Sequence, residues 1–182
     1  MDELVLTEGQ SKAMDMVERL LKEEDATVAV LSGYAGVGKS TLLKYIAQVF
    51  GMPKVITSTG KAALRVQEAA GIPASTIHKY LYNATEDRDT GEPIWERKPL
   101  DFIEIPMNRL IVVDEASMLS HAVYNDIAAT CTQLGLKLLL IGDSFQLPPV
   151  TKTDDGFAEF SVFTNPIVRP EFRVDMAEVV RP

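Results

Sequence analysis

The chain has 182 residues, about the size of one domain, and its 46% hydrophobic and 24% charged residues are typical of a globular protein. The net charge of −8 argues against a generally basic nucleic-acid-binding protein, although it is compatible with a local basic groove. The apolar runs are too short to cross a bilayer and the acidic start lacks the layout of a signal peptide, so we expect no membrane partner. The single cysteine, Cys131, cannot form an internal disulfide, which favours a reducing, cytoplasmic environment.

Helices and strands are predicted to alternate along the chain. Apolar residues at helical spacing predict a first helix over residues 7–24, which begins with a capping box of Thr7 and Gln10. The strands predicted from apolar and β-branched runs cover residues 27–32, 55–59, 109–115 and 137–143. The helices predicted between them cover residues 39–50, 61–71 and 121–135. This alternation predicts an α/β fold, a doubly wound parallel sheet with helices on both faces.

Residues 82–108 interrupt this alternation. The segment is polar, with a turn at Thr90-Gly91 between short alternating flanks, and predicts a small inserted β-hairpin. Trp95, the only tryptophan, comes just after the turn. Its ring could stack on a nucleic-acid base, or it could pack the hairpin onto the domain, and the sequence leaves both interpretations open. Phe102 is a second candidate for base stacking.

A glycine-rich loop follows the first predicted strand directly and opens the next helix. Residues 33–40, GYAGVGKS, satisfy the pattern G-x-x-x-x-G-K-[ST] in the strand–loop–helix context that a phosphate-binding P-loop requires. Glycines let backbone N–H groups converge on an anion, and the helix N-terminus adds partial positive charge. Lys39 is expected to reach the β- and γ-phosphates of ATP, and the Ser40 hydroxyl to bind Mg²⁺. The nucleotide-binding residues predicted in this loop are Gly33, Ala35, Gly36, Val37, Gly38, Lys39, Ser40 and Thr41.

Carboxylates end two further strands at the same predicted edge of the sheet. In LIVVDEAS, Asp114 is expected to hold Mg²⁺ and Glu115 to orient or deprotonate the attacking water. Adjacent residues of a strand point to opposite faces, so this pair must lie where the strand gives way to a loop. In LLLIGDSFQLPPV, Asp143 ends the next strand, and the Gln146 amide is expected to contact the γ-phosphate and sense its loss.

The motifs GYAGVGKST, TSTGKAALRV, STIHKYL, VVDEASM, IGDSFQLPPV and AEVVRP occur in the order found in RecD/Dda-type superfamily 1 DNA helicases, which the chain resembles from about Leu6 to Arg181. The resemblance implies a RecA-like P-loop NTPase fold that hydrolyses ATP with Mg²⁺. It also implies movement 5′ to 3′ along single-stranded DNA. Residues 1–81 and 109–182 would form the first RecA-like domain, and the inserted hairpin would be a pin that splits the duplex.

The resemblance also implies roles for individual residues. LTEGQ is similar to the adenine-reading Q motif, so Gln10 would read the adenine edge, in competition with its capping role. Arg181 matches the arginine that reaches the γ-phosphate in this family. The residues that would contact DNA are Thr59, Gly60, Lys61, His78 and Trp95.

Helicases of this family place ATP between two RecA-like domains, and the second is absent from this sequence. We therefore expect a second RecA-like domain as a partner, in cis or in trans, and weak activity for the chain alone. The sequence leaves two other functions open. One is a non-catalytic, ATP-dependent nucleic-acid-binding subunit, and the other is a P-loop phosphotransferase, which leaves the GDSFQLPPV motif unexplained.

Overall fold

A six-stranded sheet forms the centre of the protein in the computed structural model, which describes residues 5–33, 38–143, 150–153, 156–159, 161 and 168–176. Each pair of neighbouring strands is parallel. The strands, in their order across the sheet, are β10 (Arg173–Asp175), β1 (Val28–Ser32), β7 (Lys137–Gly142), β6 (Leu110–Val113), β2 (Lys54–Thr57) and β3 (Ala74–Thr76). The four residues of β6 are all buried, as is expected of a strand covered on both faces.

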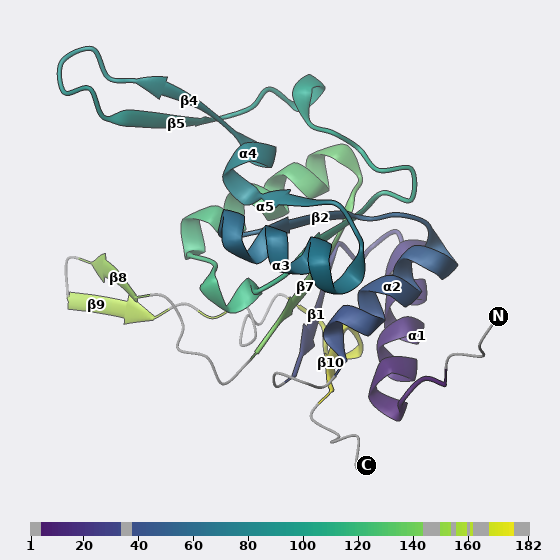
Figure 1. The fold of residues 1–182 in the computed structure, drawn as a ribbon. Helices are drawn as coiled ribbons and strands as arrows, with labels where there is room; N and C mark the ends of the chain where they lie inside the picture. The colour runs from purple at the N-terminus through teal and green to yellow at the C-terminus, as the bar shows by residue number, and fades with distance from the viewer. Residues whose placement is uncertain are drawn as a thin grey trace.

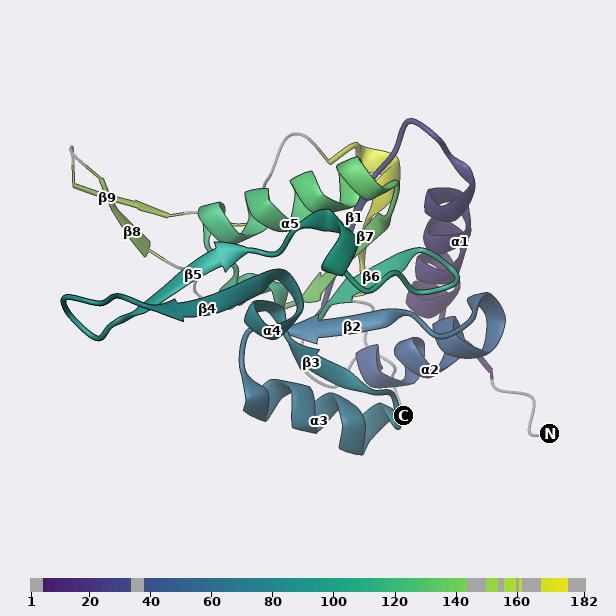
Figure 2. The same cartoon turned by 90° about the horizontal axis from the view of Figure 1, so that it is seen from above.

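Helices cover both faces of this sheet, which confirms the predicted fold class. Figure 2 shows α5 on one face and α2 and α3 on the opposite face, while α1 packs against β1 and β10. The helices are α1 (Glu8–Lys22), α2 (Lys39–Phe50), α3 (Gly60–Ala70), the short α4 (Ile77–Leu81) and α5 (His121–Leu134). None of the described helices has the length and apolar character needed to cross a membrane.

Cys131 lies buried on α5 within the core. Burial raises the pKa of its thiol to about 12, so the side chain stays protonated and unreactive at neutral pH. It serves as a small apolar group in the packing of α5.

Within the described residues, two antiparallel hairpins lie outside the central sheet. The predicted hairpin is formed by β4 (Tyr82–Glu86) and β5 (Pro93–Arg97), and it projects away from the sheet (Figure 1). Gly91 takes a left-handed conformation at φ 70° in its turn. The inserted hairpin is shorter than the predicted segment, because residues after Arg97 run back to β6 through a 3-10 turn, η1 (Leu100–Phe102). The second hairpin, β8 (Val150–Thr153) and β9 (Gly156–Glu159), was not predicted.

Two of the predicted strands end two residues earlier in the structure, where a helix cap or a turn begins. The strand expected over residues 55–59 ends at Thr57, because the Thr59 side chain accepts a hydrogen bond from the Ala62 N–H and caps α3. The strand expected over residues 109–115 ends at Val113. That early end places Asp114 and Glu115 in the loop beyond the strand, as their adjacency required.

Candidate functional site

The part of the P-loop that the structure describes connects β1 to α2 at the carboxyl edge of the sheet. The Gly33 N–H donates to the Gly142 carbonyl at the end of β7 over 3.1 Å, which fixes the start of the loop. Lys39 is the first residue of α2, and its Nζ donates to the Gly33 carbonyl over 3.3 Å. The lysine ammonium therefore lies beside Gly33 at the start of the loop. Ser40 and Thr41 follow in the exposed first turn of α2, whereas Ala35, Gly36 and Val37 lie outside the described residues.

Gln10 joins the start of α1 to the P-loop. Its Oε1 accepts from the Thr7 N–H over 3.0 Å and its N–H donates to Thr7 Oγ1 over 3.1 Å, which confirms the capping box. Its Nε2 also donates to the Gly38 carbonyl over 3.2 Å. Gly38 has φ 85°, a left-handed conformation that favours glycine, and a Cβ at this position would lie 2.4 Å from Gln10 Nε2 and displace that amide. The role of Gln10 in adenine recognition remains a prediction.

Asp114 and Glu115 lie at the end of β6. The Asp114 N–H donates to the Ile56 carbonyl over 3.0 Å, and the Glu115 N–H donates to Asp114 Oδ1 over 2.9 Å. Burial raises the pKa of the Asp114 carboxyl, and this is opposed by the Glu115 N–H and by the nearby Lys39 ammonium. Glu115 has φ 53°, a left-handed conformation that is uncommon for a side chain other than glycine.

Arg65 is a residue of this site that the sequence interpretation missed. Its Nη1 lies 3.3 Å from Glu115 Oε1, so a salt bridge crosses from α3 to the loop after β6. Arg65 follows Lys61 by four residues on the same helix. A second cation at this spacing was the available sequence signal, but nothing in the sequence identified Glu115 as its partner.

A cavity of about 610 Å³ brings these groups together. It lies between α2 and α3 and is lined by Lys39, Ser40, Arg65, Asp114, Glu115 and Asp143, among others. Mg²⁺ is commonly held by one or two protein oxygens together with phosphate oxygens, and the Ser40 hydroxyl and the Asp114 carboxylate suit that role. The lining therefore fits a nucleoside triphosphate with Mg²⁺. The predicted Gln146 and Arg181 lie outside the described residues.

A second hollow, of about 240 Å³, lies between α3 and the β3–α4 segment. Its lining includes Gly60 at the start of α3, together with Thr76 and Lys79. A Cβ at Gly60 would meet nothing within 4 Å, so the backbone there is open to a ligand. Lys61 is exposed on the first turn of α3, next to this hollow in the sequence. Lys79 is a further basic residue that the sequence interpretation missed, although it follows the predicted His78 directly.

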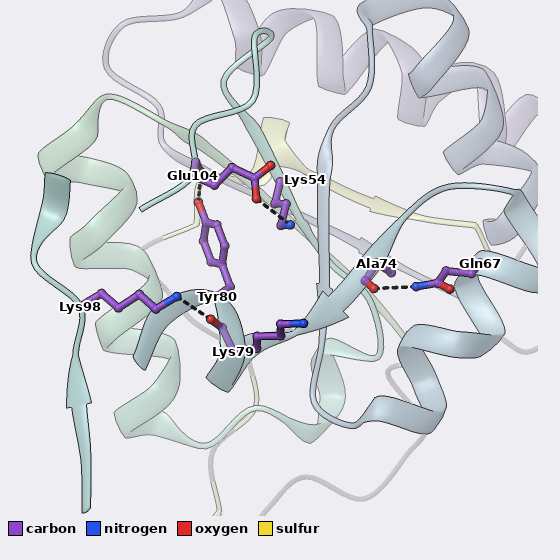
Figure 3. A network of polar contacts seen from close by, with 7 residues as sticks. All are labelled: Lys54, Gln67, Ala74, Lys79, Tyr80, Lys98 and Glu104. Atoms are coloured by element: carbon purple, nitrogen blue, oxygen red, sulfur yellow. Dashed lines mark hydrogen bonds and ion pairs between the residues drawn. The ribbon is translucent and has the colours of Figure 1, made fainter. Parts of the chain in front are cut away.

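Hydrogen bonds hold α4 and β3 in place around this hollow (Figure 3). Gln67 Nε2 on α3 donates to the Ala74 carbonyl over 2.8 Å, and Lys98 Nζ donates to the Lys79 carbonyl over 2.7 Å. Tyr80 donates through its hydroxyl to the Glu104 carbonyl over 2.7 Å. Helix α4, which borders the hollow, is therefore held in place by Lys98 and Glu104 in the segment that follows β5.

His78 and Trp95, predicted separately, meet at the base of the hairpin. The His78 ring centroid lies 5.0 Å from that of Trp95, edge to face, and 5.1 Å from that of Tyr82. Trp95 remains 49% exposed. The ring thus contacts His78 and keeps about half of its surface accessible, while its stacking on a base stays a prediction.

Two side-chain contacts hold the hairpin base against α5. The Tyr82 hydroxyl donates to Asp126 Oδ2, and Arg97 Nη2 donates to Thr130 Oγ1 over 2.7 Å. Tyr82 is the first residue of β4 and Arg97 the last of β5, so one contact fixes each strand. Burial and the Asp126 contact raise the pKa of the Tyr82 hydroxyl, which therefore stays protonated as a donor.

Comparison with known families and proteins shows which proteins the chain is similar to. A family model described as an AAA domain matches residues 5–160. The chain is 36% identical over 144 residues to the ATP-dependent RecD2 DNA helicase of Deinococcus radiodurans, covering 71% of this chain and 18% of the relative. It is 30% identical over 152 residues to the ATP-dependent DNA helicase Pif1 of Campylobacter jejuni, covering 76% of this chain and 32% of the relative. The chain thus spans less than a third of the length of either relative.

Solved structures show the same fold. A Bacteroides Pif1 helicase crystal structure matches with a TM-score of 0.66 at 23% identity, covering 100% of this chain and 44% of that one. Bacteroides Pif1 in complex with ADP-AlF4 matches with a TM-score of 0.65 at 24% identity, covering 99% of this chain and 44% of that one. The chain therefore belongs to the AAA domain family and is a motor domain of the RecD/Pif1 type found in superfamily 1 helicases.

Proposed function

We propose that the chain is the first motor domain of an ATP-dependent DNA helicase that moves 5′ to 3′ along single-stranded DNA together with a second RecA-like domain. The observation that carries this proposal is the single cavity lined by Lys39, Ser40, Asp114 and Glu115. The names of the relatives, which are ATP-dependent DNA helicases, support it. A structure of Bacteroides Pif1 bound to single-stranded DNA, with a TM-score of 0.62 at 23% identity, supports the DNA partner.

We propose a separate role in ATP hydrolysis for each polar residue of the cavity. Lys39 binds the β- and γ-phosphates, and the position of its ammonium 3.3 Å from the Gly33 carbonyl, at the start of the loop, supports this role. Ser40 and Asp114 hold Mg²⁺, which neutralises phosphate charge when bound. Glu115 orients the attacking water and takes its proton. Gln146 and Arg181 are proposed from the sequence alone to contact the γ-phosphate.

We assign DNA binding to the surface that begins at the N-terminus of α3. Thr59, Gly60 and Lys61 offer a hydroxyl, open backbone and an ammonium, the donors that commonly contact phosphates. Lys79 lines the adjacent hollow. His78 and Trp95 lie further along, where the exposed half of the indole is available to stack on a base. In this proposal the β4–β5 hairpin parts the strands of a duplex.

The experiment that tests this function is steady-state ATP hydrolysis with and without oligo(dT), followed by unwinding of a forked DNA. We expect hydrolysis to depend on Lys39 and to rise with single-stranded DNA when the second motor domain is present. ATP-dependent DNA binding without any Lys39-dependent hydrolysis would instead indicate a non-catalytic subunit. Phosphate transfer to a small acceptor without DNA stimulation would indicate a phosphotransferase.

A further inference from the structure

A salt bridge between α3 and Glu115 links the two proposed sites. Arg65 Nη1 lies 3.3 Å from Glu115 Oε1, and both residues line the nucleotide cavity. We propose that Arg65 holds Glu115 in a resting position, and that single-stranded DNA bound at the start of α3 releases it. This inference rests on the proposed function, in which Glu115 is the base and α3 contacts DNA.

The pairing opposes the chemistry that Glu115 is proposed to perform. A carboxylate oxygen that accepts a hydrogen bond from a guanidinium has a lone pair occupied, so that oxygen is not available to accept a hydrogen bond from the attacking water. Arg65 comes from α3, which lies across the cavity from α2 and its Lys39. The paired carboxylate is therefore held toward α3. A base in this position must leave Arg65 before it can serve a water beside the γ-phosphate.

The helix that carries Arg65 is also the one that presents the DNA-binding residues. Lys61 and Arg65 are four residues apart, so they lie on the same face of α3. Thr59 caps this helix through the Ala62 N–H at 3.1 Å, and Gly60 leaves its first turn open. A phosphate bound there contacts the first turn of an 11-residue helix, one turn from Arg65. A displacement of α3 by the bound phosphate separates the pair.

The exposure of the pair sets the size of the effect. The Arg65 side chain is 63% exposed and that of Glu115 is 35% exposed, so solvent screens their attraction. An exposed pair of this kind favours the resting position, with Glu115 bound to Arg65, by about fivefold at most, which corresponds to about 1 kcal/mol. Such a contact is strong enough to reduce hydrolysis without DNA and weak enough for DNA to break.

Reciprocal coupling provides a test that does not depend on hydrolysis. If DNA binding breaks the pair, removing the pair must strengthen DNA binding by the same factor. We expect Arg65→Gln and Glu115→Gln each to bind fluorescent oligo(dT) about two- to fivefold more tightly without nucleotide. The double variant should bind no more tightly than either single variant. Arg65→Lys should stay close to the original protein, and Arg19→Gln, which removes an exposed arginine from α1, should show no gain.

Hydrolysis supplies the second measurement. With the second motor domain present, Arg65→Gln should raise the ATPase rate without DNA by about two- to fivefold, and so lower the ratio of the rates with and without saturating oligo(dT). Weaker oligo(dT) binding by Arg65→Gln would identify Arg65 as a DNA contact and overturn the proposal. Unchanged binding in both single variants, or equal losses of the two ATPase rates, would also overturn it. Hydrolysis that does not depend on Lys39 would instead refute the proposed function, while the binding measurements still report on the pair.

Discussion

The nucleotide cavity and the β4–β5 hairpin carry most of the proposed functional residues, but the chain holds them in different ways. The cavity lies at the ends of buried parallel strands, and all four residues of β6 are buried. In the hairpin, every residue of β5 is exposed, and so is every residue of β4 except Tyr82. The core positions Asp114 and Glu115, whereas a few contacts at its base position the hairpin.

This difference predicts how each region responds to substitution. Around the cavity, a polar side chain can change while the core keeps its shape, so loss of chemistry should come without loss of structure. At the hairpin, a similar substitution should change the orientation of the hairpin and the rate of DNA unwinding, and leave ATP hydrolysis in the nucleotide cavity unaffected. The predictions below test this separation.

The largest effect is expected for Glu115→Gln. Removing the proposed base should lower turnover of the protein with its second motor domain by a factor of about 10²–10⁴, and leave ATP binding intact. Steady-state ATPase and equilibrium binding of a fluorescent nucleotide measure the two quantities. Glu92→Gln, an exposed glutamate in the hairpin turn, is the matched control. A loss of nucleotide affinity as large as the loss of turnover would contradict the assignment.

Lys39→Ala should instead remove nucleotide binding. Hydrogen bonds to charged groups contribute about 1.5–3 kcal/mol each, so affinity should fall by about 10- to 150-fold or more. Calorimetric titration with ATP and Mg²⁺ measures this loss, and circular dichroism checks that the fold is retained. Lys44→Ala removes an exposed lysine from the same helix and should bind normally. Equal affinities for the two variants would show that Lys39 does not hold the phosphates.

Trp95→Ala tests the hairpin. A base stacked on an aromatic ring is stabilised by about 1–3 kcal/mol, so unwinding of a fork should slow by about tenfold while DNA-stimulated ATPase stays within about twofold. Ile94→Ala, on the opposite face of β5, is the control, because neighbouring residues of a strand point to opposite faces. A large drop in melting temperature with Trp95→Ala would show that the ring serves mainly to pack the hairpin on His78.

Smaller effects are expected at the hairpin base. Tyr82→Phe and Thr130→Val each remove a side-chain hydrogen bond between the hairpin and α5, at a cost of about 1 kcal/mol in unfolding free energy. Unwinding should fall by a fewfold, and ATPase should not change. Hydrogen exchange of the β4–β5 amides should become faster in both variants. Exchange of these amides at the same rate as in the original protein would show that the two contacts do not orient the hairpin.

The smallest effect is a gain in stability from Asp114→Asn. Burial raises the pKa of Asp114 in the folded state, so the folded protein loses stability as pH rises and this carboxyl ionises. The asparagine has no charge to bury and can still accept from the Glu115 N–H. We expect a slightly higher melting temperature for the variant, with a difference that widens above about pH 4, the ordinary range for Asp. The same change should weaken the Mg²⁺ dependence of ATPase. A lower melting temperature at neutral pH would contradict the burial argument.

Sequence patterns predicted the elements that are long and buried. The continuous apolar runs of β1, β6 and β7 and the helical spacing of α1 each reflect one burial environment sustained over several residues. The three-residue strands β3 and β10 are too short to show such a pattern, and their residues are partly exposed. Both were missed for this reason.

The candidate site was predicted where its chemistry is local in sequence. Lys39 and Ser40 belong to one loop motif, and Asp114 and Glu115 to one strand end. The contacts between Arg65 and Glu115, Tyr82 and Asp126, and Arg97 and Thr130 join residues that are 50, 44 and 33 positions apart. Each depends on how helices pack against the sheet, which no local pattern specifies. His78 and Trp95 were both proposed, but their ring contact could not be foreseen.

The position of β1 also bears on how the chain folds as it is synthesised. This strand emerges early, yet its two neighbours are β7, where Val28 pairs with Leu138, and β10, where Val30 pairs with Arg173. The apolar strand β1 therefore has no neighbouring strand to pair with until more than a hundred further residues have left the ribosome. Sheets that depend on such distant pairings fold slowly and expose apolar edges meanwhile. The nascent domain should consequently depend on chaperones until its last strands have been made.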